Sequence, residues 1–145
     1  MSIFDIFRDS SDKRTQKKMI GDIGEDIACE YLISQGYSII ARNVRVSKKE
    51  LDIIAENDLF TVFFEVKTLS LSKDEAERDH HRASEQISQQ KAQNTIYAAQ
   101  SWHNSHYSGK EIRIDVIEVY LGDSPARVVH TQNAINKLSL YRRRR

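Results

Sequence analysis

The chain has 145 residues, a length that fits one domain with a modest hydrophobic core. Hydrophobic residues make up 39% and charged residues 30% of it, which is ordinary for a globular protein. There is no apolar run of about 18 residues, no signal-peptide pattern and only one cysteine, so we expect no membrane span, no disulfide within the chain and a cytoplasmic location.

The net charge of +1 conceals an uneven distribution of charge along the chain. Residues 142–145 are four arginines, and Lys13, Arg14, Lys17 and Lys18 form a second basic cluster. Such clusters attract phosphate backbones, although a solvated, disordered tail explains the arginine run equally well. The rest of the chain is slightly acidic, which argues against a protein that coats nucleic acid nonspecifically.

The first half of the chain predicts one helix and three strands after a flexible N-terminal arm at residues 1–18. Apolar residues recur with helical spacing from Met19 to about Gln35, and Gly36 is a typical helix C-terminal residue. Strands are expected at 37–45, 51–56 and 60–69.

The second half predicts a charged loop at 70–82, a helix at 83–102, strands at 112–121 and 127–130, and a helical turn within 133–141. The domain should therefore span residues 19–138, followed by a basic C-terminal tail at 139–145. The expected fold class is α/β, with a central mixed five-stranded sheet flanked by helices.

Charged residues interrupt two apolar strands in a regular way. The segment ELDII at 50–54 is followed, thirteen residues after Asp52, by Glu65-Val66-Lys67. Ionised groups in apolar runs are costly unless they are paired, hydrogen-bonded or bound to metal. Strand alternation places Asp52 on the face opposite Leu51 and Ile53, and a hairpin turn near 56–58 puts Asp52, Glu65 and Lys67 on one side of the sheet. A two-residue loop would set Asp52 opposite Phe63, and a four-residue loop would set it opposite Glu65.

This cluster has the chemistry of a divalent-metal hydrolytic site. Asp52 and Glu65 supply hard oxygen ligands of the kind that Mg²⁺ prefers, with Mn²⁺ as the alternative ion, and the Val66 carbonyl adds a third. Lys67 is suited to orient the attacking water or to hold a phosphate oxygen. Glu25, at the margin of the first helix's apolar stripe, can reach over the sheet. The competing interpretations are a surface ion pair worth about 0–1 kcal/mol and a solvated Glu25.

Basic and amide residues near this cluster are candidates for nucleic-acid contacts. Arg42, Arg45, Lys48 and Lys49 form a basic strip before Asp52, placed for phosphate contacts if the loop faces a substrate. A solvated loop is an equally good explanation of this strip.

Two residues of the second helix are further candidates. Lys91 is a candidate phosphate ligand, and Gln93 shares a helix face with Tyr97, from which the pair would brace the site or contact DNA. Solvated side chains on the helix surface are the simpler alternative.

Several motifs together resemble the YraN family of bacterial proteins. They are GDIGE at 21–25, Arg42-Asn43, ELDIIA at 50–55, VFFEVK at 62–67, RIDV at 113–116, and His130 with Asn133-Ala134. They occur in the family's order from about residue 21 to 134. One departure is Lys49, where the family usually has glycine before the Glu-hydrophobic-Asp triplet.

The resemblance implies a restriction-endonuclease-like fold, close to Holliday junction resolvases. It implies that Glu25, Asp52 and Glu65 bind Mg²⁺, that Lys67 is the catalytic lysine, and that the protein hydrolyses phosphodiester bonds in branched or otherwise structured DNA. By analogy with resolvases, the protein would be a homodimer. The alternatives are a catalytically silent nucleic-acid-binding module and a protein-interaction factor on the same scaffold.

Overall fold

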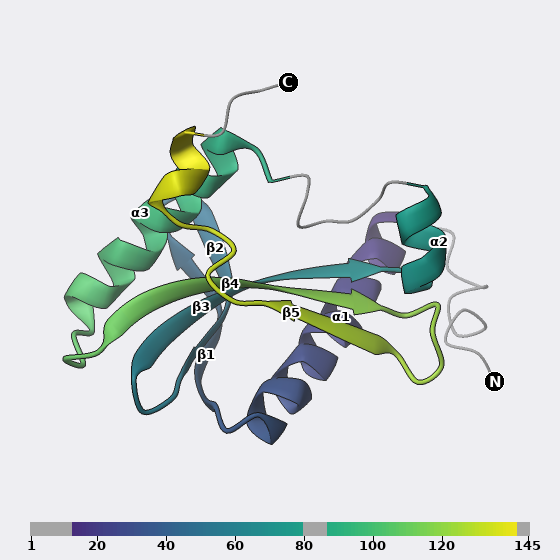
Figure 1. Ribbon diagram of the computed structural model, residues 1–145, viewed down its shortest axis with the longest axis horizontal. Helices are drawn as coiled ribbons and strands as arrows, with labels where there is room; N and C mark the ends of the chain where they lie inside the picture. The colour runs from purple at the N-terminus through teal and green to yellow at the C-terminus, as the bar shows by residue number, and fades with distance from the viewer. Residues whose placement is uncertain (1–12, 80–86, 142–145) are drawn as a thin grey trace.

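A computed structural model describes residues 13–79 and 87–141. Its elements are α1 (Lys13–Ser34), β1 (Ser38–Val46), β2 (Lys49–Glu56), β3 (Phe60–Leu69), α2 (Lys73–Arg78), α3 (Gln89–Ser105), β4 (Glu111–Tyr120), β5 (Arg127–Thr131) and the 3-10 helix η3 (Lys137–Tyr141). The α/β class and the central mixed five-stranded sheet flanked by helices are confirmed (Figure 1). Among the described helices, none is long and apolar enough to cross a membrane.

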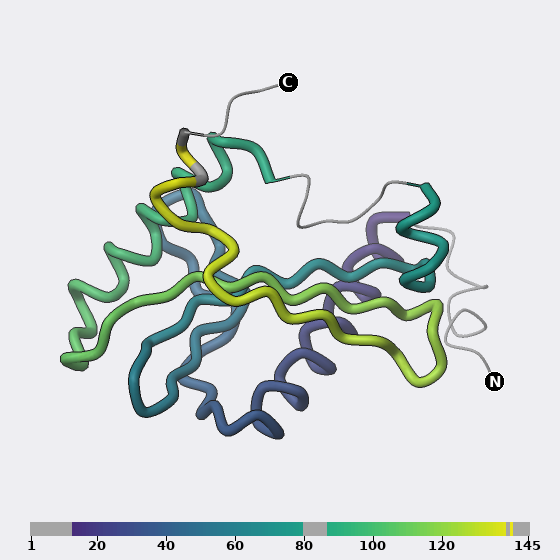
Figure 2. The backbone as a smooth tube through the Cα atoms, viewed as in Figure 1, coloured from purple at the N-terminus to yellow at the C-terminus, as the bar shows by residue number. Residues whose placement is uncertain are grey.

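The strands lie in the sheet in chain order, β1-β2-β3-β4-β5. Neighbours pair antiparallel except β3 and β4, which run parallel from Phe60↔Glu111 to Leu69↔Tyr120. A parallel pair needs a long crossover, and the chain makes it through α2 and α3 (Figure 2). The crossover places α3 against the sheet.

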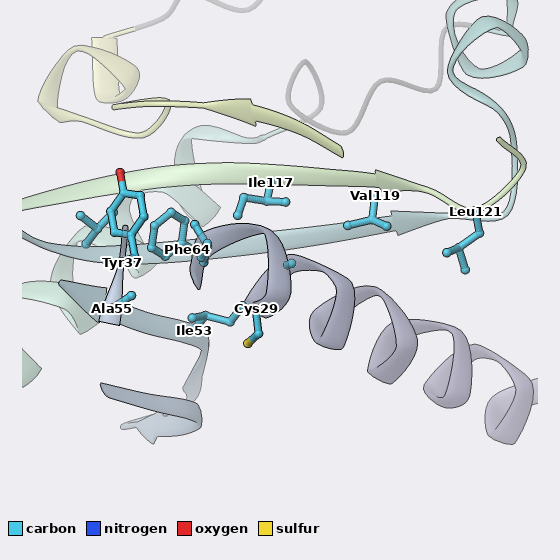
Figure 3. Close-up of a cluster of buried hydrophobic side chains, with 11 residues drawn as sticks. Cys29, Tyr37, Ile53, Ala55, Phe64, Ile117, Val119 and Leu121 are labelled. Carbon is cyan, nitrogen blue, oxygen red and sulfur yellow. The ribbon is translucent and has the colours of Figure 1, made fainter. Parts of the chain in front are cut away.

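The two faces of the sheet are covered by different helices. On one face, Leu32 and Cys29 of α1 pack against Phe64 and Ile117 (Figure 3). On the other face, small side chains of α3 pack against a second set of strand residues that includes Phe63. The alternation predicted for β3 therefore holds, and each face contributes its own apolar core.

Helix α1 ends as the sequence predicts but begins earlier. Gly36 has a φ of +91°, and the Tyr37 amide donates to the Leu32 carbonyl at 3.0 Å, a typical glycine-terminated helix end. The helix begins at Lys13, so residues 13–18 are helical although they fall within the expected flexible arm. These residues are polar good helix formers without an apolar stripe, so hydrophobic periodicity does not detect them. Residues 1–12 lie outside the described residues.

The charged segment after β3 also contains a helix where a loop was expected. Ser72 caps α2 by accepting a hydrogen bond from the Glu75 amide at 3.1 Å, and Ser72-x-x-Glu75 is a recognisable helix-start pattern. Helix α3 begins at Gln89, later than the expected residue 83, because Ser88 caps it. Residues 80–86 and the four C-terminal arginines lie outside the described residues.

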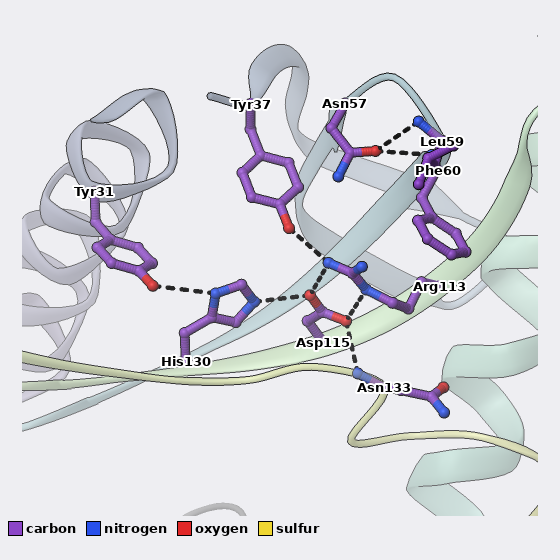
Figure 4. Close-up of polar contacts among 9 residues, drawn as sticks. All are labelled: Tyr31, Tyr37, Asn57, Leu59, Phe60, Arg113, Asp115, His130 and Asn133. Carbon is purple, nitrogen blue, oxygen red and sulfur yellow. Dashed lines mark hydrogen bonds and ion pairs between the residues drawn. The ribbon is translucent and has the colours of Figure 1, made fainter. Parts of the chain in front are cut away.

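A buried ionic network fastens β5 and the following segment to β4. Asp115 is fully buried and accepts hydrogen bonds from Arg113 (2.9 Å from both Nε and Nη2), His130 Nε2 (2.7 Å) and the Asn133 backbone amide (2.8 Å) (Figure 4). Burial would raise the pKa of Asp115, but the His130, Arg113 and Asn133 donors lower it below its ordinary value. Arg113 also donates to the Tyr37 hydroxyl at 2.6 Å, which ties the start of β1 into the network.

Candidate active site

Strands β2 and β3 part at Asp52. Their ladder runs from Glu56↔Thr61 to Ile53↔Phe64, so the loop at 57–60 is the four-residue one. Continued by one residue, this register would set Asp52 opposite Glu65. The ladder stops after Ile53, and the Asp52 carboxylate accepts a hydrogen bond from the Val66 amide at 2.9 Å. The side chain therefore takes a backbone donor that a continuing ladder would have used.

Alternation in β2 breaks at the same residue. Ile53 packs in the α1-side core, whereas Ile54 and also Leu51 pack in the α3-side core. The expectation that Leu51 and Ile53 share one face opposite Asp52 is therefore wrong. The two-residue period holds only while a strand stays in its ladder, and β2 leaves β3 here. Asp52 lies at the junction between the two faces.

Glu65 is 6% exposed, and three lysine side chains surround its carboxylate. Its Oε1 lies 2.9 Å from Lys91 Nζ and 3.4 Å from Lys67 Nζ, and its Oε2 lies 3.3 Å from Lys49 Nζ. Burial would raise the pKa of Glu65, but Lys49, Lys91 and Lys67 together lower it. Glu65 is thus held ionised, and both of its oxygens are occupied by ammonium groups.

The pKa of Lys67 is lowered, which favours its neutral form. Its burial and the neighbouring Lys91 lower the pKa of Lys67, while Glu65 opposes that shift. A lysine with a lowered pKa exchanges a proton more readily near neutral pH than an exposed one.

A pocket of about 410 Å³ opens where β2 and β3 part, under the N-terminal half of α1. Glu25 reaches it from α1, Asp52 from β2, and Val66 and Lys67 from β3. The first turns of α1 add the basic side chains of Lys13 and Lys17. Four of the predicted site residues therefore share one cavity, while Glu65 is not part of its lining.

The two carboxyl groups in this pocket have raised pKa values. Burial, and then the Asp52 charge, raise the pKa of Glu25 to about 7. Burial and the Glu65 charge raise the pKa of Asp52 to about 6, against the hydrogen bond from Val66. Both acids are therefore under-compensated by positive charge.

Two further residues hold Glu25 in place. The Asn43 amide, with its nitrogen toward the acids, donates to Glu25 Oε1 at 2.9 Å and to Glu50 Oε1 at 3.1 Å. Gly24 lets α1 approach β3, because a Cβ there would lie 1.8 Å from Thr68 Oγ1. Glycine at position 24 is therefore required for the closeness of Glu25 to the sheet.

The donor chemistry of this pocket fits a divalent cation in part. Asp52 and Glu25 are hard oxygen ligands whose mutual repulsion a cation would relieve, and Val66 also lines the pocket. The expected third acid, Glu65, is engaged by lysines. Within residues 13–79 and 87–141, no group of three or more His, Cys, Asp or Glu side chains is arranged to hold a metal ion.

The other predicted nucleic-acid contacts are distributed over three places. Arg42 forms a 2.9 Å ion pair with Asp26, and Arg45 Nε donates to the Ser47 carbonyl at 3.4 Å, both on the exposed side of β1. Lys91 belongs to the Glu65 cluster. The remaining three, Lys48, Lys49 and Gln93, line a second pocket beside α3.

Sequence reasoning missed the part played by Asn43. It has a φ of +52°, and asparagine is disfavoured in strands, which was the available signal. Lys13 and Lys17 were recognised as a phosphate-attracting cluster but assigned to the flexible arm, so their place on the acidic pocket was not foreseen.

Comparison with known proteins gives a consistent family assignment. The model of a family described as "Uncharacterised protein family UPF0102" matches residues 24–119. Similar proteins include UPF0102 proteins from Caldanaerobacter subterraneus subsp. tengcongensis (31% identity; 86% of this chain and 98% of that protein) and Clostridioides difficile strain 630 (36%; 79% and 94%). A third, from Clostridium botulinum strain Loch Maree, is 41% identical over 72% of this chain and 81% of that protein.

Among solved structures, the chain has a distant likeness to SfsA of Pyrococcus furiosus in complex with Ca²⁺. The sequence identity is 16% and the TM-score 0.29, and the match covers 80% of this chain and 63% of that one.

Proposed function

The chain belongs to the uncharacterised protein family UPF0102, the YraN family, and from this premise we propose that it is a metal-dependent nuclease that hydrolyses DNA phosphodiester bonds. One observation carries the proposal. Where β2 and β3 part, Asp52 and Glu25 have raised pKa values and share a pocket with Lys67. Under-compensated acids beside a lysine in a cavity are typical of hydrolytic sites.

In this proposal Asp52, Glu25 and the Val66 carbonyl hold Mg²⁺, with Mn²⁺ as a substitute. A bound divalent cation acidifies water and offsets the charge that develops on the phosphodiester. The Val66 amide fixes the orientation of the Asp52 carboxylate through its 2.9 Å hydrogen bond. Asn43 does the same for Glu25.

Lys67 is the residue that acts on the reacting atoms. It lines the pocket and lies 3.4 Å from Glu65 Oε1, so its ammonium is held at the edge of the cavity. From there it holds a nonbridging phosphate oxygen or orients the attacking water. Glu65 positions Lys67, and burial together with Lys91 lowers the pKa of Lys67, which makes its proton easier to exchange.

The basic lining at the start of α1 favours an anionic substrate. Lys13 and Lys17 are placed on the side of the pocket opposite the strands and would receive the phosphates flanking the scissile bond. The place of the YraN family near the Holliday junction resolvases adds branched or structured DNA as the expected substrate.

A second candidate function is DNA binding without turnover. The observation that favours it is the engagement of both Glu65 oxygens by Lys49, Lys67 and Lys91. In the part of the chain that the structure describes, Glu25 and Asp52 are then the two carboxylates that line the pocket. Such a module would bind DNA with strong salt dependence and cleave none of it.

The test is cleavage of labelled single-stranded, duplex, flapped and four-way-junction DNA in Mg²⁺ or Mn²⁺. Lys67→Ala should lower the rate by about 100-fold or more, because a donor aimed at developing charge is typically worth that much. Lys110→Ala is the matched control, since Lys110 pairs with Glu56 at the opposite end of the β2–β3 hairpin. Equal cleavage by wild type and Lys67→Ala would contradict the proposal, and DNA binding without cleavage by wild type would establish the second function.

A further inference from the structure

The second pocket, between the β1–β2 turn and α3, is the feature that the proposed chemistry does not use. Its volume is about 460 Å³, within the range of about 300–1,000 Å³ that is usual for small-molecule sites. Resting on the proposed function, we propose that it binds an unpaired nucleotide of single-stranded DNA next to the scissile phosphate, with the base against Tyr97 and the phosphate on Lys48 and Lys49.

The wall formed by α3 presents amides and one aromatic ring. Four residues of α3 line this wall: Gln90, Gln93, Asn94 and Tyr97. The last three lie three, four and seven residues after Gln90, so all four lie on one face of the helix. All four side chains are exposed, and Tyr97 is 64% exposed although it is a large aromatic residue. This face is not packed against the sheet and is available to a ligand.

Amide side chains have the donor and acceptor pairs that read base edges. Gln90 Nε2 donates to Asn94 Oδ1 at 2.9 Å, which orients both amides and leaves the Gln90 oxygen and the Asn94 nitrogen for a ligand. The Gln93 amide makes no hydrogen bond to another residue in the described part of the chain. Glutamine and asparagine pair with adenine through two hydrogen bonds, and tyrosine offers a stacking surface to any base.

The opposite wall of the pocket is basic. Ser47 turns the chain with a φ of +57°, and Lys48 and Lys49 follow it into the pocket lining. Among the described residues, no acidic side chain belongs to this lining. Lys49 also pairs with Glu65, and Lys48 adds a second ammonium to the same wall, so this wall attracts a phosphate. Polar amides, an aromatic face and lysines are together the chemistry of a nucleotide.

The position of the pocket connects it to the proposed active site. Lys49 lines the pocket and also reaches Glu65 Oε2 at 3.3 Å, while Lys91, next to Gln90 in the sequence, reaches Glu65 Oε1. Glu65 in turn contacts Lys67 of the acidic pocket. A strand that places one nucleotide against Tyr97 would thus pass over the lysine cluster toward Asp52.

The pocket selects unpaired DNA because its contacts require an exposed base. In a duplex the base faces are stacked on their neighbours, and Tyr97 could stack only on a nucleotide taken out of the helix. Flaps, single strands and junctions supply such nucleotides without the cost of unpairing.

The experiment measures the dissociation constants of a labelled single-stranded oligodeoxynucleotide and of its duplex by fluorescence anisotropy, at one fixed salt concentration and in EDTA so that no cleavage occurs. The full chain is compared with Tyr97→Ala, with Tyr97→Phe, which keeps the ring, and with Tyr107→Ala. Tyr107 is the matched control because it is 74% exposed beyond the other end of α3.

We expect Tyr97→Ala to weaken single-strand binding by about tenfold, the usual loss of one stacked base, and to leave duplex binding within about twofold. Tyr97→Phe and Tyr107→Ala should bind as wild type does. Unchanged single-strand binding by Tyr97→Ala, or an equal loss on duplex, would overturn the nucleotide pocket while leaving the nuclease proposal to its cleavage assay. A selective loss in a protein that cleaves nothing would support the pocket and contradict the nuclease.

Discussion

Asp115 and Asp52 are both carboxylates within the sheet, but their surroundings shift their pKa values in opposite directions. Asp115 accepts hydrogen bonds from Arg113, His130 and the Asn133 amide, and its pKa is lowered. Asp52 accepts one hydrogen bond, from Val66, and its pKa is raised to about 6. Burial alone therefore does not mark a candidate functional acid, whereas burial that the hydrogen-bond donors do not offset does.

The difference has a consequence for stability that depends on pH. A carboxyl whose folded-state pKa is lowered stabilises the fold above its unfolded pKa, and the contribution is lost as the pH falls through the folded pKa. A carboxyl whose folded-state pKa is raised destabilises the fold once the pH rises above its unfolded-state pKa. Asp115 belongs to the first class and Asp52 to the second.

The largest expected effect on stability comes from replacing Asp115, the carboxylate whose hydrogen-bond donors outweigh its burial. Asp115→Asn should lower the free energy of unfolding by about 3–5 kcal/mol at pH 7, because it leaves the Arg113 guanidinium without its buried partner. Urea denaturation followed by circular dichroism measures this loss. A loss below about 1 kcal/mol would show that the network is not structural.

Asp52→Asn should instead raise the free energy of unfolding, by about 1–3 kcal/mol at pH 8, because the amide oxygen keeps the Val66 hydrogen bond and the charge penalty disappears. The gain should be smaller at pH 5, inside the window between the ordinary pKa and about 6. Asp58→Asn, an exposed change in the β2–β3 turn, is the control. Destabilisation by Asp52→Asn at both pH values would remove the contrast with Asp115.

The pH dependence of the proposed cleavage sharpens the same contrast. Because the pKa of Asp52 is raised to about 6 and that of Glu25 to about 7, the rate at limiting Mg²⁺ should rise about 100-fold per pH unit below pH 6, where both acids must lose a proton, and about tenfold between pH 6 and 7. It should level off above pH 7. Glu25→Gln should remove the upper step. A rate that is flat between pH 5.5 and about 8 would show that neither acid needs to lose its proton.

The smallest effect is expected at Lys49. Lys49→Ala should change the free energy of unfolding by less than about 1 kcal/mol, because Lys67 and Lys91 still face the Glu65 carboxylate. Thermal denaturation at pH 7 measures it. A loss as large as that of Asp115→Asn would mean that the Glu65 cluster is structural as well.

Much of the fold follows from patterns that act locally. The apolar alternation of β3 and the glycine end of α1 could be predicted because side-chain period and backbone conformation decide them. The first turns of α1 could not, since Lys13 and Lys17 carry no apolar stripe. The capped helix α2 was overlooked although Ser72 and Glu75 show the helix-start pattern.

For the candidate site, motif spacing predicted that Asp52 and Lys67 lie near each other, but not how they are arranged. The break at Asp52 depends on where β2 leaves β3, which is a property of the sheet and not of the strand's own residues. Likewise, the three lysines around Glu65 come from β2, β3 and α3, and only the assembled fold shows that they neutralise it.

The most direct test of the contrast is a pH titration of the Asp52 and Asp115 carboxyl carbons by NMR, with and without Mg²⁺. We expect Asp52 to titrate near pH 6 in the absence of metal and at lower pH in its presence. Asp115 should stay ionised below the ordinary aspartate range, and its titration should not change when Mg²⁺ is added. An Asp52 that titrates at its ordinary value and does not respond to Mg²⁺ would contradict the assignment of the functional acid.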